Sequence, residues 1–257
     1  MSNAHYWTDK ENRAEVAKKH IIFIQNNFSD SIKNSVDNTI IYGINGRTPN
    51  PKLADNIKQT IKVVPDGSVS GAFNYGIGKT CILNFASYKF PGGAYTEGSR
   101  AQEECLCMES TLYNVLSRFA EFYDWNKQHL NKGLYLDRAL YSKDILFEHN
   151  GIKREFDVLT CAAPNYSTAS RYNSCSKEEN DNILKTRIDF IIDILIEQNI
   201  DTCILGAYGC GVFGQNATDV ANYFKESIKR LNANIVFAVL ENPYDNNYAQ
   251  FIKVFNN

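Results

Sequence analysis

The chain has 257 residues, of which 44% are hydrophobic and 22% are charged. The hydrophobic fraction is enough for a sizeable core and excludes wholesale disorder, and the length suits one large α/β domain or two small ones. A formal net charge of −2 excludes the basic footprint that duplex DNA requires, although backbone groups can still hold a polyanionic ligand.

The cysteines and histidines argue against a disulfide framework and a metal centre. The seven cysteines are odd in number and lie mostly in apolar runs, so we expect a reducing compartment, cytoplasmic or, in a eukaryote, nuclear. No CxxC pair occurs and the four histidines are scattered, so no zinc site is expected. No apolar run approaches the ~20 residues of a membrane span, and the first residues lack the apolar core of a signal peptide. We expect a monomer with no membrane partner.

The N-terminal third predicts one helix, a short strand and a loop-rich segment. Thr8-Asp9-Lys10-Glu11 is a capping-box pattern, and the apolar positions behind it predict a helix over about residues 9–28. The β-branched run 39–44 predicts a strand. Residues 45–78 are rich in glycine and proline and predict loops, with a short strand at 61–64.

The middle of the chain predicts two buried strands and an amphipathic helix. Residues 80–86 form a largely apolar run, typical of a strand buried on both faces. A glycine loop follows, and then Ser99 and Gln102 form a second capping-box pattern ahead of an apolar stripe that runs from Cys105 to Phe119. Residues 144–147 predict an edge strand, and residues 156–163 predict a further apolar strand.

Strands and helices continue to alternate to the end of the chain. Residues 165–179 are polar and predict a long loop. Residues 184–196 predict a helix and residues 202–207 a strand; behind the second glycine loop, the apolar positions from 220 to 231 predict a helix and residues 235–240 a strand. Asn242-Pro243 predicts the start of a last helix. This alternation predicts an α/β fold with a mostly parallel or mixed sheet between helices. Because no linker or repeat is visible, we treat residues 1–257 as one domain.

Both glycine loops lie between a predicted strand and a predicted helix. The first runs from Asn84 to Ala94 and leads to Gln102-Glu103-Glu104, and the second is the segment 206–215. Ligands of open α/β sheets bind beyond the carboxyl ends of the strands, and glycine-loop amides near a helix start can hold a diphosphate. The alternative is that both loops are only tight turns. Neither matches a Walker A or G-x-G-x-x-G pattern.

Two glutamates follow the first loop. Glu103 and Glu104 lie in the first turn of the predicted helix, where acidic side chains either complement the helix dipole or serve a ligand. Since successive helical residues point ~100° apart, we expect the two carboxylates to face different directions. Cys210, between two glycines of the second loop, has no nameable histidine partner, so packing is favoured over a nucleophilic role.

The two loops together resemble one known family. Pro91-Gly92-Gly93-Ala94, followed after seven residues by Gln102-Glu103-Glu104, resembles the poly(ADP-ribose) glycohydrolase signature GGG-x(6–8)-QEE. The second loop, GAYGCGVFGQ, is similar to the GCGAFGN segment of the microbial-type members. The resemblance extends over about residues 12–240. One departure is Ala94, which stands where the family has a third glycine; alanine is costly there only if the position needs a positive φ or a close approach.

The resemblance implies a fold, an activity and a site. The fold is a macrodomain-like three-layer α/β/α arrangement with a mixed, mostly parallel sheet and an N-terminal helical extension. The activity is hydrolysis of ribose–ribose O-glycosidic bonds in poly(ADP-ribose), without a metal or cofactor, and the partner is ADP-ribose or its polymer on modified proteins. Glu104 is implied as the catalytic acid and Glu103 as the residue that bonds the ribose hydroxyls.

The remaining implied residues contact the substrate or support its loops. They are Asn84, Gly92, Gly93, Ala94, Gln102, Gly209, Cys210, Gly211, Val212 and Phe213. Asn84 and Phe213 are implied to reach the distal ribose, and the amides of residues 209–212 are implied to wrap the diphosphate. Two alternatives stay open, namely a hydrolase of single ADP-ribose units and a non-catalytic ADP-ribose reader.

Overall fold

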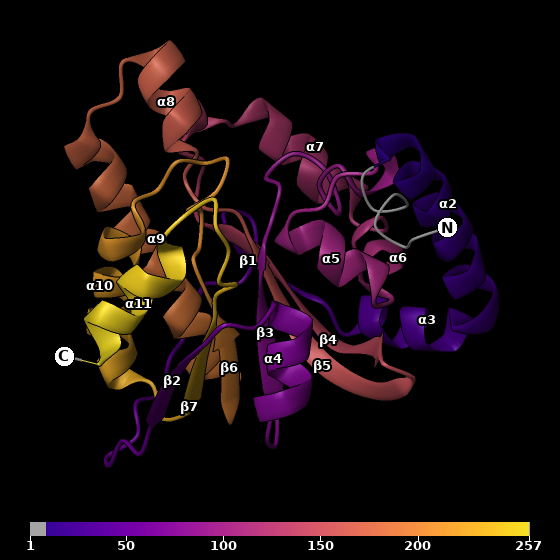
Figure 1. Cartoon of the computed structure of the whole chain (residues 1–257), viewed down its shortest axis with the longest axis horizontal. Coiled ribbons are helices and arrows are strands. Elements are labelled where there is room, and N and C mark those ends of the chain that lie inside the picture. Colours follow the sequence, from indigo (N-terminus) through magenta and orange to yellow (C-terminus); the bar gives the residue numbers. More distant parts are fainter. Residues whose placement is uncertain (1–8, 257) are drawn as a thin grey trace.

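The computed structural model describes residues 9–256, in which seven strands form one mixed sheet (Figure 1). The strands are β1 (Ile40–Gly43), β2 (Thr60–Val64), β3 (Thr80–Phe85), β4 (Arg138–His149), β5 (Ile152–Cys161), β6 (Thr202–Leu205) and β7 (Asn234–Ala238). Their order is β1-β4-β5-β3-β6-β7-β2. The pairs β1/β4 and β4/β5 are antiparallel and the other four pairs are parallel, as the sequence predicts.

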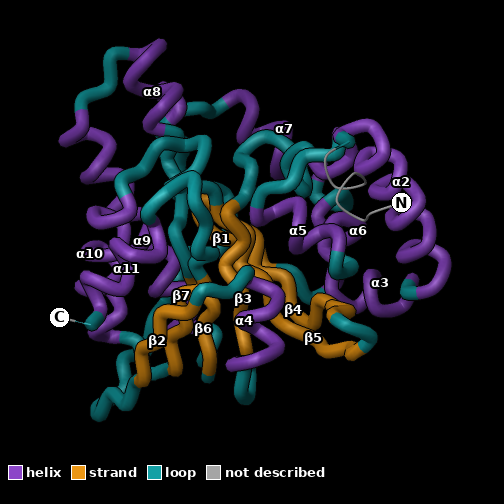
Figure 2. Tube along the Cα trace, in the orientation of Figure 1, coloured by secondary structure: helices purple, strands orange, loops and turns teal. Residues whose placement is uncertain are grey.

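Helices cover both faces of this sheet (Figure 2). They are α2 (Lys10–Asn27), α3 (Ser29–Asp37), α4 (Ser68–Tyr75), α5 (Gln102–Met108), α6 (Leu112–Leu116), α7 (Ala120–Gln128), α8 (Tyr166–Asn173), α9 (Lys177–Glu197), α10 (Ala217–Ser227) and α11 (Asn247–Phe255). Helices α9, α10 and α11 lie on one face, and α2 to α6 lie on the other (Figure 1). The result is the predicted three-layer α/β/α fold. Among the described helices, none is long and apolar enough to cross a membrane.

The core consists of one large apolar cluster on each face of the sheet. Alternate residues of β3 show this division, since Cys81 and Leu83 belong to the cluster under α9 to α11, whereas Ile82 belongs to the cluster under α4 to α6. Side chains in a strand point alternately to the two faces, so a strand covered on both sides is apolar throughout. This explains the unbroken apolar run in the sequence.

The N-terminal helix α2 braces the segment that follows the first glycine loop. Asp9 caps the helix by accepting hydrogen bonds from the backbone of residues 11 and 12; Thr8 of the predicted capping box lies outside the described residues. Farther along α2, Arg13 Nε donates to Gly98 O at 2.7 Å, and His20 Nδ1 lies 2.8 Å from Tyr95 Oη. The predicted helical extension therefore supports the route from the glycine loop to α5.

The prediction of a long loop at residues 165–179 was wrong. This segment contains α8 and the beginning of α9. The Asn165 side chain accepts a hydrogen bond from Thr168 N, and Ser176 and Glu179 form a capping box at the start of α9. Polar residues here are helix caps rather than loop formers. Helix α4 likewise lies inside the segment predicted as loop, and neither α3 nor α7 was anticipated.

The predicted helix behind Ser99 differs from the structure in its start and in its length. It begins at Gln102, and Ala101 rather than Ser99 is the N-cap residue. The apolar stripe continues through two helices, α5 and α6, because the helical backbone is interrupted around Ser110. There Thr111 N donates to Leu146 O on β4 at 3.0 Å, a contact that a continuous helix would exclude.

Two further boundaries were also predicted wrongly. Residues 144–147 are part of the longer strand β4, whose residues 138–141 pair with β1, so the predicted short strand had the wrong bounds. Residues 145–147 extend past β1 and pair with β5 alone among the strands, so this part of β4 does lie at the edge of the sheet. The last helix begins at Asn247 instead of Asn242, because the Asn242 side chain accepts hydrogen bonds from the backbone of Tyr244 and Asp245 and forms a turn.

Candidate active site

The two glycine loops leave neighbouring strands at the same edge of the sheet. β3 and β6 are paired in parallel, with Thr80 opposite Thr202 and Ile82 opposite Ile204. The carboxyl ends of both strands therefore lie side by side, as the ligand site of an open α/β sheet requires. We call the segment 86–101 loop A and the segment 206–216 loop B.

Gln102 ties the beginning of α5 to the end of β3. Its Oε1 accepts a hydrogen bond from Phe85 N at 2.8 Å, and its Nε2 donates to Leu83 O at 2.9 Å and to Ser68 Oγ at 3.0 Å. The side chain thus bonds α4, β3 and α5 together. Gln102 was implied to support the loop, and its three contacts fit that supporting role.

Glu103 is buried and points back toward the end of β3. Its Oε2 accepts from Ser87 N at 2.6 Å, and its Oε1 accepts from Asn84 Nδ2 at 3.2 Å. Burial raises the pKa of Glu103 to about 8, against the opposing effect of these donors. Within the described residues Asn84 Oδ1 is a buried acceptor with no partner. At the end of β3, the unpartnered Oδ1 of Asn84 therefore lies beside the carboxyl group of Glu103, whose raised pKa favours the protonated form.

Glu104 faces loop A from the first turn of α5. Its Oε1 accepts from Ala94 N and its Oε2 accepts from Ala101 N, each at 2.9 Å. Both glutamates reach the same place, because a Cβ atom on Gly93 would lie 2.6 Å from Glu104 Oε1 and 2.9 Å from Glu103 Oε2. The two carboxyl groups bond different segments, as their expected different directions imply, but one oxygen of each lies near the same glycine. Their Cα–Cβ bonds diverge, but the long side chains bend back to one glycine.

The amides of loop A serve the glutamates. Ala94 N donates to Glu104, Gly93 N donates to Phe90 O at 3.1 Å, and the backbone of Gly92 bonds the carboxyl group of Glu103. Gly92 and Gly93 have φ values of +68° and +62°, which favour glycine, whereas Ala94 has a φ of −105°. Alanine in place of the third glycine therefore causes no backbone strain.

Loop B is closed by hydrogen bonds between its own backbone groups, but three of its N–H groups have no acceptor among the described residues. Gln215 N donates to Gly209 O at 3.1 Å, and Cys210 N donates to Ala207 O at 3.1 Å, so the Cys210 amide is already used. By contrast, the N–H groups of Gly211, Val212 and Phe213 donate to no acceptor in the described part of the chain. Loop B thus has backbone N–H groups without an acceptor, whereas amides of loop A bond the carboxyl groups of both glutamates.

Phe213 joins loop B to an aromatic cluster that includes Tyr88 of loop A. Tyr88 and Tyr135 stack with their ring centroids 4.2 Å apart, and Phe213 meets Tyr135 edge-to-face at 6.1 Å. Val212, next to Phe213, is 86% exposed. The sequence did not indicate Tyr88 or Tyr135, because they come from separate segments and match no motif.

Cys210 packs rather than reacts. Its Sγ is directed to Tyr208 O, and burial raises the pKa of its thiol to about 12. A thiol with so high a pKa is a poor nucleophile near neutral pH. In the part of the chain that the structure describes, no three His, Cys, Asp or Glu side chains gather as a metal site.

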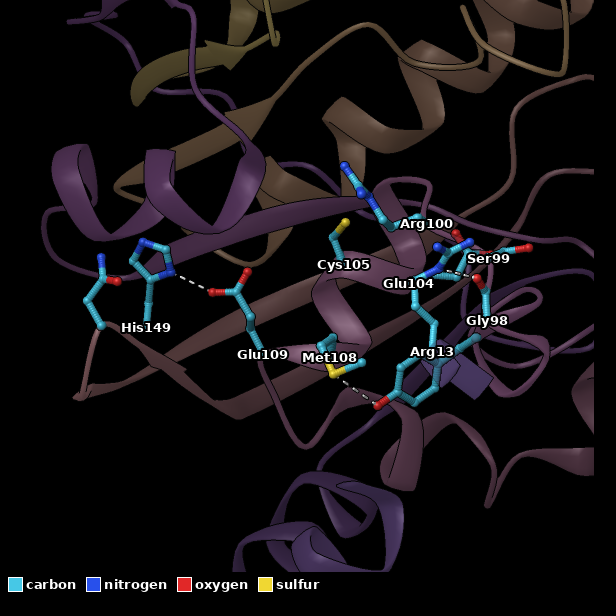
Figure 3. Close-up of a pocket in the computed structure, with 11 residues that line it drawn as sticks. Arg13, Gly98, Ser99, Arg100, Glu104, Cys105, Met108, Glu109 and His149 are labelled. Atoms are coloured by element: carbon cyan, nitrogen blue, oxygen red, sulfur yellow. Dashed lines mark hydrogen bonds and ion pairs between the residues drawn. The ribbon is translucent and has the colours of Figure 1, made fainter. Parts of the chain in front are cut away.

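Two cavities flank α5. One of about 520 Å³ extends along the helix, with Arg13, Arg100 and Glu104 toward one end and the hydrogen-bonded pair His149–Glu109 toward the other (Figure 3). The other, of about 380 Å³, lies at the ends of β3, β6 and β7 and is lined by Gln102, Ala207 and Asp66, among other residues. The second cavity, which we call the groove, lies at the carboxyl edge of the parallel strands, where open α/β sheets bind their ligands. Glu104 lines the first cavity and not the groove, and Arg100 lines both.

Comparisons with known proteins point to one group. Poly(ADP-ribose) glycohydrolase from Thermomonospora curvata, solved with the inhibitor ADP-HPD, has a TM-score of 0.81 and 24% identity over 95% of this chain and 99% of its own. The same enzyme from Deinococcus radiodurans, solved with ADP-ribose, has a TM-score of 0.77 and 25% identity over 88% of this chain and 96% of its own. No curated protein matches the chain.

The family model described as "Microbial-type PARG, catalytic domain", where PARG stands for poly(ADP-ribose) glycohydrolase, matches residues 9–149. This match covers more than half of the chain and includes loop A and both glutamates. Loop B lies outside that match. The chain belongs to the microbial-type PARG catalytic-domain family.

Proposed function

We propose that the protein is a glycosidase that hydrolyses the ribose–ribose O-glycosidic bonds of poly(ADP-ribose) and releases ADP-ribose, with Glu104 as general acid and base. The observation that carries this proposal is the convergence of the Glu103 and Glu104 carboxyl groups at Gly93. The convergence lies at the base of two loops on adjacent strands, and the solved relatives of this fold hold ADP-ribose or ADP-HPD.

Glu104 is the proton donor and acceptor in this proposal. In the proposed reaction it donates a proton to the leaving oxygen while the bond to the ribose C1 atom breaks and an oxocarbenium-like centre forms. The same carboxylate then takes a proton from the attacking water. Two backbone N–H groups hold its oxygens in place.

Glu103 and Asn84 complement this role at the distal ribose. Burial keeps Glu103 largely protonated near neutral pH, since its pKa is about 8, and a neutral carboxyl group can both donate to and accept from ribose hydroxyls. The unpartnered Oδ1 of Asn84 supplies a further acceptor at the strand end. Burying these groups without a ligand is costly, which is a reason to expect a hydroxyl-rich ligand here.

The substrate's diphosphate has its donors in loop B. The amides of Gly211, Val212 and Phe213 have no acceptor among the described residues and can bind an anion by hydrogen bonds alone. Such binding needs no cluster of basic side chains, which fits a chain whose net charge is −2. Held there, the diphosphate would also stabilise the developing positive charge on the ribose. We propose further that residues 1–257 act as one domain and as a monomer.

The test incubates the protein with poly(ADP-ribose) and, separately, with a mono-ADP-ribosylated protein, and measures the released ADP-ribose by chromatography. We expect release from the polymer and a loss of at least about 100-fold in kcat for Glu104→Gln, which keeps the size of the side chain but cannot transfer a proton. Calorimetry of ADP-ribose binding to the same variant checks that the groove is intact. Full turnover by Glu104→Gln would overturn the assignment of the acid. Release from the mono-modified protein alone would indicate a single-unit hydrolase, and binding without any release would indicate a reader.

A further inference from the structure

An exposed aromatic ring with two lysines lies at the beginning of the glycine turn of loop A, and the mechanism above gives it no role. We define the Phe90 patch as Lys89, Phe90 and Lys127. Phe90 is 50% exposed, and the Nζ atoms of Lys127 and Lys89 lie 5.2 Å and 6.0 Å from the centroid of its ring. Lys127 also pairs with Asp124, whereas Lys89 makes no ion pair within residues 9–256.

The patch is held in place relative to the catalytic carboxylates. Phe90 N donates to Ser87 Oγ at 3.2 Å, and the N–H of the same Ser87 donates to Glu103. Phe90 O accepts from Gly93 N at 3.1 Å, which closes a turn, and such a turn brings its first and last Cα atoms within about 7 Å. The exposed ring is thus one turn away from the glycine at which both carboxylates converge.

The segment that carries Lys127 is fixed to the same loop. Asn126 is buried, and its Nδ2 donates to Tyr88 O at 2.8 Å, so the end of α7 is bonded to loop A two residues before Phe90. The backbone segments that carry the ring and the two lysines are therefore fixed relative to each other.

The chemistry of this surface matches the leaving group of the proposed reaction. When a ribose–ribose bond of the polymer breaks, the departing oxygen is a ribose hydroxyl of the neighbouring ADP-ribose unit. That ribose carries an adenine base and, through its 5′-oxygen, a diphosphate. An exposed aromatic ring stacks on a base of any kind, and ammonium groups attract phosphates.

We propose that the Phe90 patch is the subsite for the leaving nucleotide, namely the ADP-ribose unit on the far side of the bond that is cut. The proposal rests on the proposed function. The adenine of that unit stacks on Phe90, and its diphosphate lies near Lys89 and Lys127. A mono-ADP-ribosylated protein has no such nucleotide, so the patch favours polymer over single units.

The test compares Phe90→Ala with Phe23→Ala, a matched control because Phe23 is 53% exposed on α2. KM and kcat are measured on poly(ADP-ribose) of defined chain length, and the Kd of ADP-ribose is measured by calorimetry. We expect Phe90→Ala to raise KM for the polymer about tenfold, the scale of one lost base stack, with the Kd of ADP-ribose unchanged. Phe90→Trp should keep the wild-type KM, and Lys89→Ala should weaken the dependence of kcat/KM on salt.

The outcomes separate the subsite from the function on which it rests. If the wild-type protein releases ADP-ribose from polymer and Phe90→Ala leaves KM unchanged, the subsite is overturned and the activity stands. A parallel weakening of ADP-ribose binding in Phe90→Ala would place Phe90 in the terminal-unit site and would also overturn the proposal. If the wild-type protein releases nothing from polymer, the proposed function falls, and the subsite falls with it.

Discussion

The Oε1 atom of Glu104 lies 2.6 Å from the point that a Cβ atom on Gly93 would occupy, and the backbone of Gly93 has a φ of +62°. Glycine is therefore required at this position for two reasons, since the left-handed conformation disfavours any other residue and a methyl group would displace the acid. An oxygen of the Glu103 carboxyl group lies 2.9 Å from the same point.

We expect Gly93→Ala to lower kcat by about 100-fold, because a displacement of a catalytic group by about 1 Å has an effect of that size. The left-handed backbone should add about 1–2 kcal/mol of destabilisation. Steady-state kinetics and thermal unfolding check both effects. Ala94→Gly is the control for the fold, because Ala94 has a φ of −105° and needs no glycine; a similar loss of stability in both variants would contradict this explanation.

The raised pKa of Glu103 predicts a pH dependence of stability. Its pKa is about 8 in the folded protein against an ordinary 4.5, so the folded state binds this proton more tightly than the unfolded state does. The free energy of unfolding should therefore fall as the pH rises from about 4.5 to about 8, by an amount of the order of a few kcal/mol, and this contribution should be constant above that range.

Glu103→Gln removes the titrating group and should flatten that dependence. Urea unfolding of the wild type and the variant at pH 5, 6.5 and 8.5 measures the difference in slope. The amide of the variant would face at least one of the donors that Glu103 accepts from, and this adds a destabilisation that does not itself depend on pH. The slope of stability against pH, and not its absolute level, therefore reports the titration of Glu103. Parallel pH profiles for the two proteins would show that Glu103 is not the source.

Removal of the Gln102 side chain should loosen the junction of α4, β3 and α5. Gln102→Ala leaves the half-buried Phe85 N–H without its acceptor and breaks two further hydrogen bonds, so we expect a destabilisation of about 1–3 kcal/mol and a fall in kcat. Gln128→Ala is a suitable control, because Gln128 is exposed at the end of α7 and should change stability by less than about 0.5 kcal/mol. Equal stabilities for the two variants would argue against an anchoring role.

The glycines of loop B should respond differently to alanine. Gly209 has a φ of +75°, and a Cβ atom there would lie 2.8 Å from Ala163 Cβ and 2.9 Å from Gln215 Cγ, so Gly209→Ala should lower the melting temperature and weaken ADP-ribose binding. A Cβ atom on Gly211 would meet nothing within 4 Å. Gly211→Ala should therefore fold with wild-type stability, and any effect of this variant on the Kd of ADP-ribose would report contact with the ligand. Melting curves and calorimetry distinguish the two cases, and a normal melting temperature for Gly209→Ala would refute the strain argument.

Several features of this protein were determined by local patterns in its sequence. The apolar runs 80–86 and 202–207 identified two buried strands, and the glycines behind them identified the loops of the site. The spacing of Gly92-Gly93 and Gln102-Glu103-Glu104 identified the family. These patterns are legible because strand burial, positive φ and the first turn of a helix each depend on residues that are neighbours along the chain.

The tertiary structure decided how the site residues are used. The Ala94 amide holds Glu104 and the Ser87 amide holds Glu103, so loop A arranges both carboxyl groups, whereas the N–H groups of residues 211–213 in loop B have no acceptor among the described residues. Helix α2 supports loop A through Arg13 and Gly98, which are 85 residues apart in the chain. Hydrogen bonds over such separations depend on how the elements pack, and no local pattern encodes them. For the same reason two adjacent glutamates, which helical geometry alone would direct apart, meet at one glycine.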